Sequence, residues 1–192
     1  MPLTLVTGPV RSGKSRFAER LASELSLPVT YVATARADAG DAEWAARIAH
    51  HAARRPATWT VLETADKSHD LARVLCDAAS GSVLLVDSLG TWLGSVMRER
   101  LESRGSDAAL DERELEGETE RIAEACERTA ATAIVVTEEV GWGIVPEFPS
   151  GRVFRDVLGR LNQRLARSAD RAYLVVAGIA LDLRAIGTAV QQ

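Results

Sequence analysis

The chain has 192 residues, of which 23 are Lys or Arg and 27 are Asp or Glu, so that its formal net charge is −4. This balance argues against a broad nucleic-acid-binding surface, which requires an excess of positive charge to displace counterions from the phosphates. The length fits one compact α/β domain and no linker rich in Pro, Gly or Ser divides it, so we expect a single domain over residues 1–192.

The first half of the chain alternates between short apolar runs and helical patterns. Residues 3–7 predict a strand and residues 14–25 a helix, followed by a strand at 29–33, a helix at 41–54 and a strand at 58–62. A further helix is predicted at 67–79, and a fully apolar strand at 83–86.

The second half continues this alternation. A mostly helical stretch over 88–128 is interrupted by a polar segment at 102–107, and a strand at 133–137, a helix at 151–168 and a strand at 172–177 follow. The longest apolar run, AYLVVAGIAL at 172–181, is about half as long as a membrane-spanning helix, and the N-terminus lacks a basic segment followed by a hydrophobic stretch. We therefore expect a cytoplasmic protein without an integral membrane segment.

The apolar strands indicate the fold class. They do not alternate between apolar and polar residues, and each is followed by a helix. Strands of this kind are buried on both faces, which is typical of a parallel sheet covered by helices. The predicted fold class is therefore α/β, with three layers and a mostly parallel central sheet.

The stretch GPVRSGKS at residues 8–15 fits the phosphate-binding pattern Gly-x-x-x-x-Gly-Lys-Ser. It lies between a predicted strand and a predicted helix, where backbone N–H groups and the helix N-terminus can surround a triphosphate. In this pattern Lys14 reaches the outer phosphates and Ser15 is a ligand of Mg²⁺. The alternative is a glycine turn that only leads into a helix. The stretch consists of Gly8, Pro9, Val10, Arg11, Ser12, Gly13, Lys14 and Ser15.

Asp87 ends the apolar run VLLVD. Ligands of such sheets bind beyond the carboxyl ends of the strands, and a carboxylate at this point is typical of the second Mg²⁺ ligand of P-loop proteins. The alternative role is that of an N-cap for the helix that begins near Ser88.

The helix predicted at 41–54 carries a cationic face with an imidazole. Arg47, His50 and Arg54 stand at positions i, i+3 and i+7, so they share a face. The two nearby arginines disfavour the imidazolium form, which leaves a neutral ring that can attack phosphorus. A solvated polar face is the alternative interpretation.

The segment EEVGWGIVPEF at 138–148 follows the strand at 133–137. Gly141 and Gly143 permit close backbone approach, and Pro146 stiffens the segment. A long loop at this end of a strand often contacts the ligand, although packing alone could also explain it.

Three stretches, GPVRSGKS, RIAHHAARRPATW and EEVGWGIVP with FRDVLGRLNQRLA, together resemble one family. It is the family of bifunctional adenosylcobinamide kinases and adenosylcobinamide-phosphate guanylyltransferases, which act in cobalamin biosynthesis. The resemblance covers nearly the whole chain, and it implies a RecA-like P-loop NTPase fold and a cytosolic homo-oligomer, commonly a trimer. It also implies two reactions on a corrinoid: ATP or GTP phosphorylates a hydroxyl of adenosylcobinamide, and GTP then gives GMP to that phosphate.

The resemblance assigns roles residue by residue. It implies that residues 8–15 form the phosphate loop, with Lys14 as a catalytic residue, and that His50 carries GMP covalently. Mg²⁺ would be held by Ser15 and Asp87. This sequence departs from the family at Pro9, where Gly or Ala is usual, and at Glu138, where Asn is common. The other implied nucleotide contacts are Thr34, Ala35, Arg36, His51, Ala52, Ala53, Arg54, Glu63 and Asp87.

Two other functions compete with this interpretation. A simple P-loop kinase would remove only the γ-phosphate of GTP, and a non-catalytic nucleotide-binding switch would modify nothing. The stretches IAHH and VGWGIVP favour the transferase over both. The sequence leaves open which nucleotide drives phosphorylation, which residues bind the corrinoid and which residue is the general base.

Overall fold

The computed structural model describes residues 2–35, 42–64, 70–104 and 110–190. The side chains of Glu43, Trp44, Arg47, His50, His51 and Arg104 also lie outside this description. The elements are β1 (Leu3–Thr7), α1 (Lys14–Glu24), β2 (Val29–Ala33), α2 (Ala42–Ala53), β3 (Thr60–Glu63), α3 (Leu71–Cys76), β4 (Val83–Asp87), α4 (Leu89–Arg104), α5 (Glu112–Arg128), β5 (Thr132–Val136), α6 (Pro149–Ser168), β6 (Arg171–Val176), β7 (Ile179–Asp182) and α7 (Leu183–Ile186).

The strands of the described residues form one seven-stranded sheet in the order β3-β2-β4-β5-β1-β6-β7. Strands β1 to β6 pair in parallel, and β7 pairs antiparallel with β6 at the edge. The carboxyl ends of β1, β4 and β5 therefore lie side by side at one edge of the sheet. This edge is where a ligand binds in open parallel sheets.

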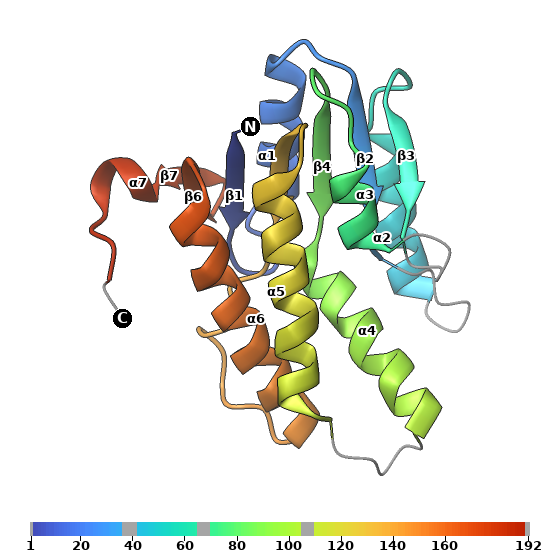
Figure 1. The fold of residues 1–192 in the computed structure, drawn as a ribbon, viewed down its shortest axis with the longest axis vertical. Coiled ribbons are helices and arrows are strands. Elements are labelled where there is room, and N and C mark those ends of the chain that lie inside the picture. The colour runs from blue at the N-terminus through green and yellow to red at the C-terminus, as the bar shows by residue number, and fades with distance from the viewer. Residues whose placement is uncertain (1, 36–41, 65–69, 105–109, 191–192) are drawn as a thin grey trace.

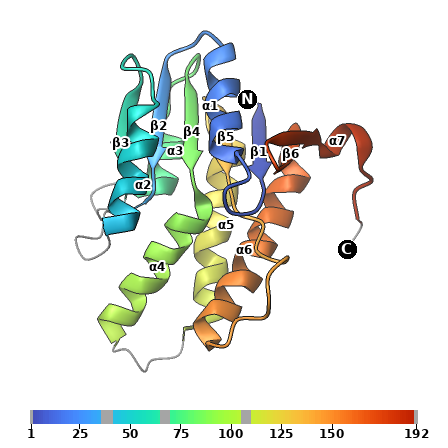
Figure 2. The ribbon, with the colours of Figure 1, turned by 180° about the vertical axis from the view of Figure 1, so that it is seen from behind.

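Helices cover both faces of the sheet. Figure 1 shows α3, α5 and α6 in front of the strands, and Figure 2 shows α1 and α2 in front when the molecule is seen from behind. Alternate residues of the strands divide between two buried clusters: Leu5 and Val135 face the α3–α6 side, whereas Val6 and Val136 face α1. Because β1, β4 and β5 are buried along almost their whole length, their sequences are mostly apolar.

Most predicted elements are confirmed with shifts of one or two residues. The helix predicted at 67–79 is shorter, however, since α3 begins after the N-cap Asp70, whose side chain accepts from the N–H of Ala72, and ends at Cys76. Residues 65–69 lie outside the described part of the chain. The helix α4 continues to Arg104, so the interruption predicted at 102–107 begins later than expected.

The edge strand β7 was not predicted. The strand predicted at 172–177 is confirmed as β6, but the apolar run continues to 181, and the chain reverses within it at Ala177 and Gly178, which both have positive φ angles, 51° and 79°. Two adjacent residues with positive φ produce the tight turn of an antiparallel hairpin. No helix in the described ranges is long and apolar enough to cross a membrane.

Candidate functional site

The loop of residues 8–15 joins β1 to α1 at the carboxyl edge of the sheet. Gly8 is required by close packing, because a Cβ there would lie 2.3 Å from the carbonyl oxygen of Val175. Gly13 adopts a left-handed conformation, with φ 97°, at the N-cap of α1. The hydroxyl of Ser12 is buried and has no hydrogen-bond partner among the described residues. An oriented loop with an unused buried donor at a helix N-terminus is suited to an anion.

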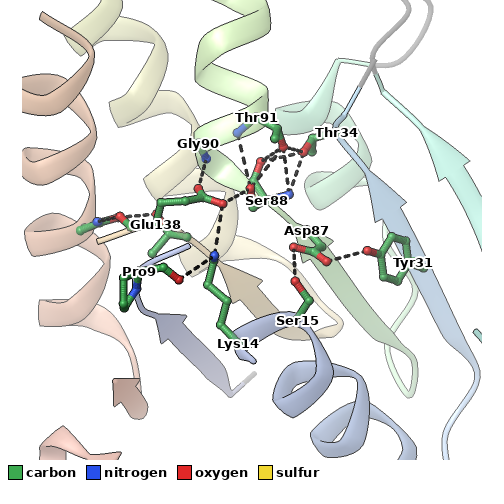
Figure 3. A network of polar contacts seen from close by, with 12 residues as sticks. Pro9, Lys14, Ser15, Tyr31, Thr34, Asp87, Ser88, Gly90, Thr91 and Glu138 are labelled. Carbon is green, nitrogen blue, oxygen red and sulfur yellow. Dashed lines mark hydrogen bonds and ion pairs between the residues drawn. The ribbon is translucent and has the colours of Figure 1, made fainter. Parts of the chain in front are cut away.

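Lys14 is the first residue of α1, and its side chain is only 8% exposed. Its Nζ donates to the carbonyl oxygen of Pro9 at 3.4 Å and lies 3.8 Å from Oε1 of Glu138. The ammonium thus folds back over its own loop, as Figure 3 shows. This position places a positive charge where the outer phosphates of a bound nucleotide would lie.

Ser15 and Asp87 meet beside the loop. The hydroxyl of Ser15 donates to Oδ1 of Asp87 at 3.2 Å, and the hydroxyl of Tyr31 donates to Oδ2 at 2.6 Å (Figure 3). Burial, followed by the negative charge of Asp87, raises the pKa of Tyr31, so Tyr31 remains a neutral donor that orients the carboxylate. The start of α4 is instead capped by Ser88 and Glu138, which accept from the N–H groups of Thr91 and Gly90.

The pair of Ser15 and Asp87 fits Mg²⁺. A hydroxyl and a carboxylate supply the hard oxygen atoms that this ion prefers. Among the described residues no group of three or more His, Cys, Asp and Glu side chains could hold a metal ion. A protein site with two oxygen ligands suits Mg²⁺, which takes its remaining ligands from water and phosphates.

A second polar network joins β2, β4 and β5. The buried Thr34 donates through Oγ1 to the carbonyl oxygen of Ser88 at 2.6 Å and accepts from the N–H of Ser88 at 2.8 Å. The hydroxyl of Ser88 donates to Oε1 of Glu138 at 2.7 Å. Through Glu138 this network reaches Lys14, so Thr34 and the phosphate loop belong to one connected site (Figure 3).

The helix α2 follows β2 and packs near α1 at its C-terminal end. Arg54, just after the helix, forms an ion pair with Glu19 of α1 at 3.2 Å. The guanidinium of Arg55 lies 3.6 Å from the ring centroid of Tyr31, whose hydroxyl binds Asp87. The segment that carries the two histidines is therefore anchored next to the Ser15–Asp87 pair.

The remaining predicted residues differ in how closely they approach this centre. Ala52 and Ala53 are exposed on α2, and Val10 is exposed on the loop. Glu63 is the exposed last residue of the edge strand β3, paired in register with Ala33. Among the predicted site residues, the nucleotide contact Arg36 lies outside the described residues, as do the side chains of the catalytic candidate His50 and of the nucleotide contact His51.

Sequence patterns did not identify several residues of this site. Tyr31 reads as an ordinary strand residue, and Ser88 and Thr91 read as the start of a helix. Arg55 lies within the stretch RIAHHAARRPATW but was given no role, and Glu19 belongs to no motif. A weak signal existed for Glu138, because it directly follows an apolar strand whose end was expected to face the nucleotide.

Comparisons with known proteins find relatives that match nearly the whole chain. The family model described as cobinamide kinase / cobinamide phosphate guanyltransferase matches residues 4–183. The bifunctional adenosylcobalamin biosynthesis protein CobU of Salmonella typhimurium is 39% identical over 185 residues, covering 95% of this chain and 99% of that protein. The corresponding CobP of Pseudomonas aeruginosa is 39% identical over 180 residues, covering 94% and 96%, and CobU of Escherichia coli is 37% identical over 189 residues, covering 95% and 99%.

Solved structures support the fold class. An ATPase from the type III secretion system of pathogenic bacteria superimposes with a TM-score of 0.55 at 10% identity, covering 97% of this chain and 58% of that chain. The ATP synthase subunit NeqB from Nanoarcheaum equitans gives a TM-score of 0.52 at 12% identity, covering 97% and 52%. At such low identity the likeness concerns the fold alone, and it confirms the predicted α/β P-loop class.

Proposed function

This chain belongs to the cobinamide kinase / cobinamide phosphate guanyltransferase family, and from this premise we propose how one nucleotide site serves two activities. The protein is a transferase of adenosylcobalamin biosynthesis with kinase and guanylyltransferase activities. Its substrates are a nucleoside triphosphate, ATP or GTP for the first reaction and GTP for the second, and the corrinoid adenosylcobinamide with its phosphate.

The observation that carries this proposal is the junction of Lys14, Ser15 and Asp87 at the end of the loop. Lys14 and Ser15 are the first two residues of α1, and the hydroxyl of Ser15 donates to Asp87, so a cation and a pair of hard oxygen ligands lie at the start of this helix. Phosphoryl transfer requires mainly positioning and stabilisation of charge on the transferred group, which these groups supply. Bound Mg²⁺, held by Ser15 and Asp87, would neutralise charge on the phosphate oxygens.

In the kinase reaction the hydroxyl oxygen of the corrinoid loses its proton to solvent and forms a bond to the γ-phosphorus, and the bond from that phosphorus to the bridging oxygen breaks. Lys14 stabilises the charge on the outer phosphates, and the loop N–H groups hold them in place. The nucleoside diphosphate then leaves. Residues 1–192 act in this proposal as a single nucleotide-binding transferase domain.

In the guanylyl-transfer reaction we assign the nucleophile to His50. Its imidazole nitrogen forms a bond to the α-phosphorus of GTP and pyrophosphate leaves; an oxygen of the corrinoid phosphate then displaces His50 and yields adenosylcobinamide-GDP. The contacts of Arg54 with Glu19 and of Arg55 with Tyr31 support this assignment, since they anchor the histidine segment beside the phosphate site. The homotrimer and the cytoplasmic location stay predictions.

Replacing the loop lysine tests the proposal. In Lys14→Ala we expect the kinase turnover with adenosylcobinamide to fall by at least about 100-fold, because the outer phosphates lose their main protein cation. Lys67→Ala, which removes the only other lysine of the chain, is the matched control and should retain turnover. Product analysis of the wild-type reaction by mass spectrometry distinguishes the proposed enzyme from the two alternative functions. A simple kinase yields corrinoid phosphate only, and a non-catalytic switch leaves both nucleotide and corrinoid unchanged.

A further inference from the structure

Glu138 faces the loop lysine from the neighbouring strand. It lies two residues beyond the end of β5, and β5 lies between β1 and β4 in the sheet. Its Oε1 is 3.8 Å from Nζ of Lys14, and the two side chains are only 22% and 8% exposed. Figure 3 shows the carboxylate and the ammonium pointing toward each other across the end of the phosphate loop. Two opposite charges of this proximity and burial form an ion pair that solvent screens only in part.

The carboxylate is held in place by further donors. Ser88 donates through its hydroxyl to Oε1 at 2.7 Å, and the N–H of Gly90 donates to Oε2 at 3.0 Å. A Cβ at Gly90 would lie 2.0 Å from Oε2, so a larger residue there would displace the carboxylate from this position. The backbone of Glu138 is fixed as well, since Asn162 of α6 donates to its carbonyl oxygen at 2.9 Å. These hydrogen bonds therefore fix the carboxylate of Glu138 in its position facing Lys14.

The charges around Glu138 are unequal. Lys14 of α1 faces it with a positive charge, Asp87 at the end of β4 adds a negative one, and the groups from α4 and α6 are neutral. Burial raises the pKa of Glu138, Lys14 lowers it, and Asp87 raises it again. Lys14 is thus the cation that balances this carboxylate while the loop holds no phosphate.

We propose that Glu138 is the resident counter-ion of Lys14, which the terminal phosphate of a nucleoside triphosphate must displace. This inference rests on the proposed function, because it uses Lys14 as the ligand of the outer phosphates. A carboxylate and a phosphate oxygen compete for one ammonium, and the two anions repel each other in a partly buried site. Glu138 therefore weakens triphosphate binding and speeds nucleotide release.

This role suits an enzyme with two nucleotide-dependent reactions. The nucleoside diphosphate left by the kinase reaction must leave before GTP enters for guanylyl transfer. Return of Lys14 to Glu138 replaces the contact that the departing phosphate loses. The effect is largest for ligands that place a phosphate beside Lys14, so it should be greater for GTP than for GDP.

Calorimetric titrations with Mg²⁺-GTP and Mg²⁺-GDP test the inference in Glu138→Gln, which keeps the shape of the side chain but removes its charge. Glu139→Gln is the matched control, since it makes the same charge change one residue away, where the carboxylate accepts from the N–H of Gly141 in an exposed hydrogen bond. We expect Glu138→Gln to bind GTP at least about tenfold more tightly, with slower dissociation and a smaller gain for GDP. The dissociation constant of Glu139→Gln for GTP should stay within about twofold of the wild-type value.

Several outcomes would overturn the inference. If Glu138→Gln binds GTP no more tightly than the wild type, Glu138 does not compete with the phosphate for Lys14. If Glu139→Gln gains the same affinity for GTP, the gain results from the change in net charge alone. Glu138→Asn repeats the test with a shorter amide if the first variant does not fold. A wild-type protein that binds no nucleotide would instead contradict the proposed function itself, so the two failures are distinguishable.

Discussion

Asp87 connects the proposed metal ligand Ser15 to the segment that carries the two histidines. Its two carboxylate oxygens accept from Ser15 and Tyr31, and the ring of Tyr31 lies under the guanidinium of Arg55. The sequence pattern VLLVD predicted the place of Asp87 at the end of a strand, because local hydrophobicity defines where a buried strand stops. It could not predict Tyr31 or Arg55 as neighbours, since these contacts depend on the order of strands in the sheet.

Asp87→Asn should lower the affinity of the site for Mg²⁺. The amide keeps an oxygen but loses the charge that attracts the ion, so we expect the Mg²⁺ concentration for half-maximal kinase rate to rise by about tenfold or more. Mg²⁺ titrations at fixed nucleotide concentration measure this value. Asp77→Asn, an exposed residue paired with Arg73, serves as the control. An unchanged titration in Asp87→Asn would make Asp87 a structural residue only.

At the scale of elements, the sequence predicted the parallel strands well and the edges of the molecule less well. Central strands such as β4 and β5 are buried on both faces, so their apolar runs mark them clearly. The edge strand β7 was not predicted, because the turn that precedes it, at Ala177 and Gly178, lies inside an apolar run. A positive φ at alanine has no sequence signature of its own, and tertiary pairing with β6 decides it.

Two arginines of helix α6 hold the segment 141–148 against the helix. Arg155 donates to the carbonyl oxygens of Ile144 and Gly141 at 2.9 and 3.1 Å, and Arg152 donates to those of Pro146 and Glu147 at 2.9 and 2.7 Å. These bonds hold a segment whose large apolar side chains are exposed. Arginines that the pattern of α6 places opposite its buried stripe therefore order the neighbouring loop.

Arg155→Ala should release this segment without unfolding the protein. Two carbonyl groups lose their charged donor, so we expect faster amide hydrogen exchange in peptides that cover 141–148, with a melting temperature only about 2–4 °C lower. Arg73→Ala, which removes an exposed ion pair on α3, should leave exchange in that segment unchanged. Hydrogen exchange measured by mass spectrometry decides the matter: identical protection in Arg155→Ala and the wild type would show that other contacts order the loop.

At the scale of the whole molecule, the residues of the candidate site lie at the carboxyl ends of the parallel strands. The strand order places the ends of β1, β5 and β4 side by side, which brings Lys14, Glu138 and Asp87 together although they are far apart in the sequence. On the face that α1 covers, Arg54 ties the end of α2 to Glu19. The loop of residues 8–15 and the histidine segment thus belong to neighbouring elements, as the proposed transfer through His50 requires.

Retention of labelled phosphate on His50 tests the central claim most directly. The protein is incubated with Mg²⁺ and GTP labelled at either the α- or the γ-phosphate, denatured, and analysed by intact mass and peptide mapping. We predict that the α-label alone remains as an acid-labile, base-stable adduct, which is absent in His50→Ala although that variant retains kinase activity, and present in His51→Ala. Equal labelling of His50→Ala and the wild type, or retention of the γ-label in place of the α-label, would contradict the account.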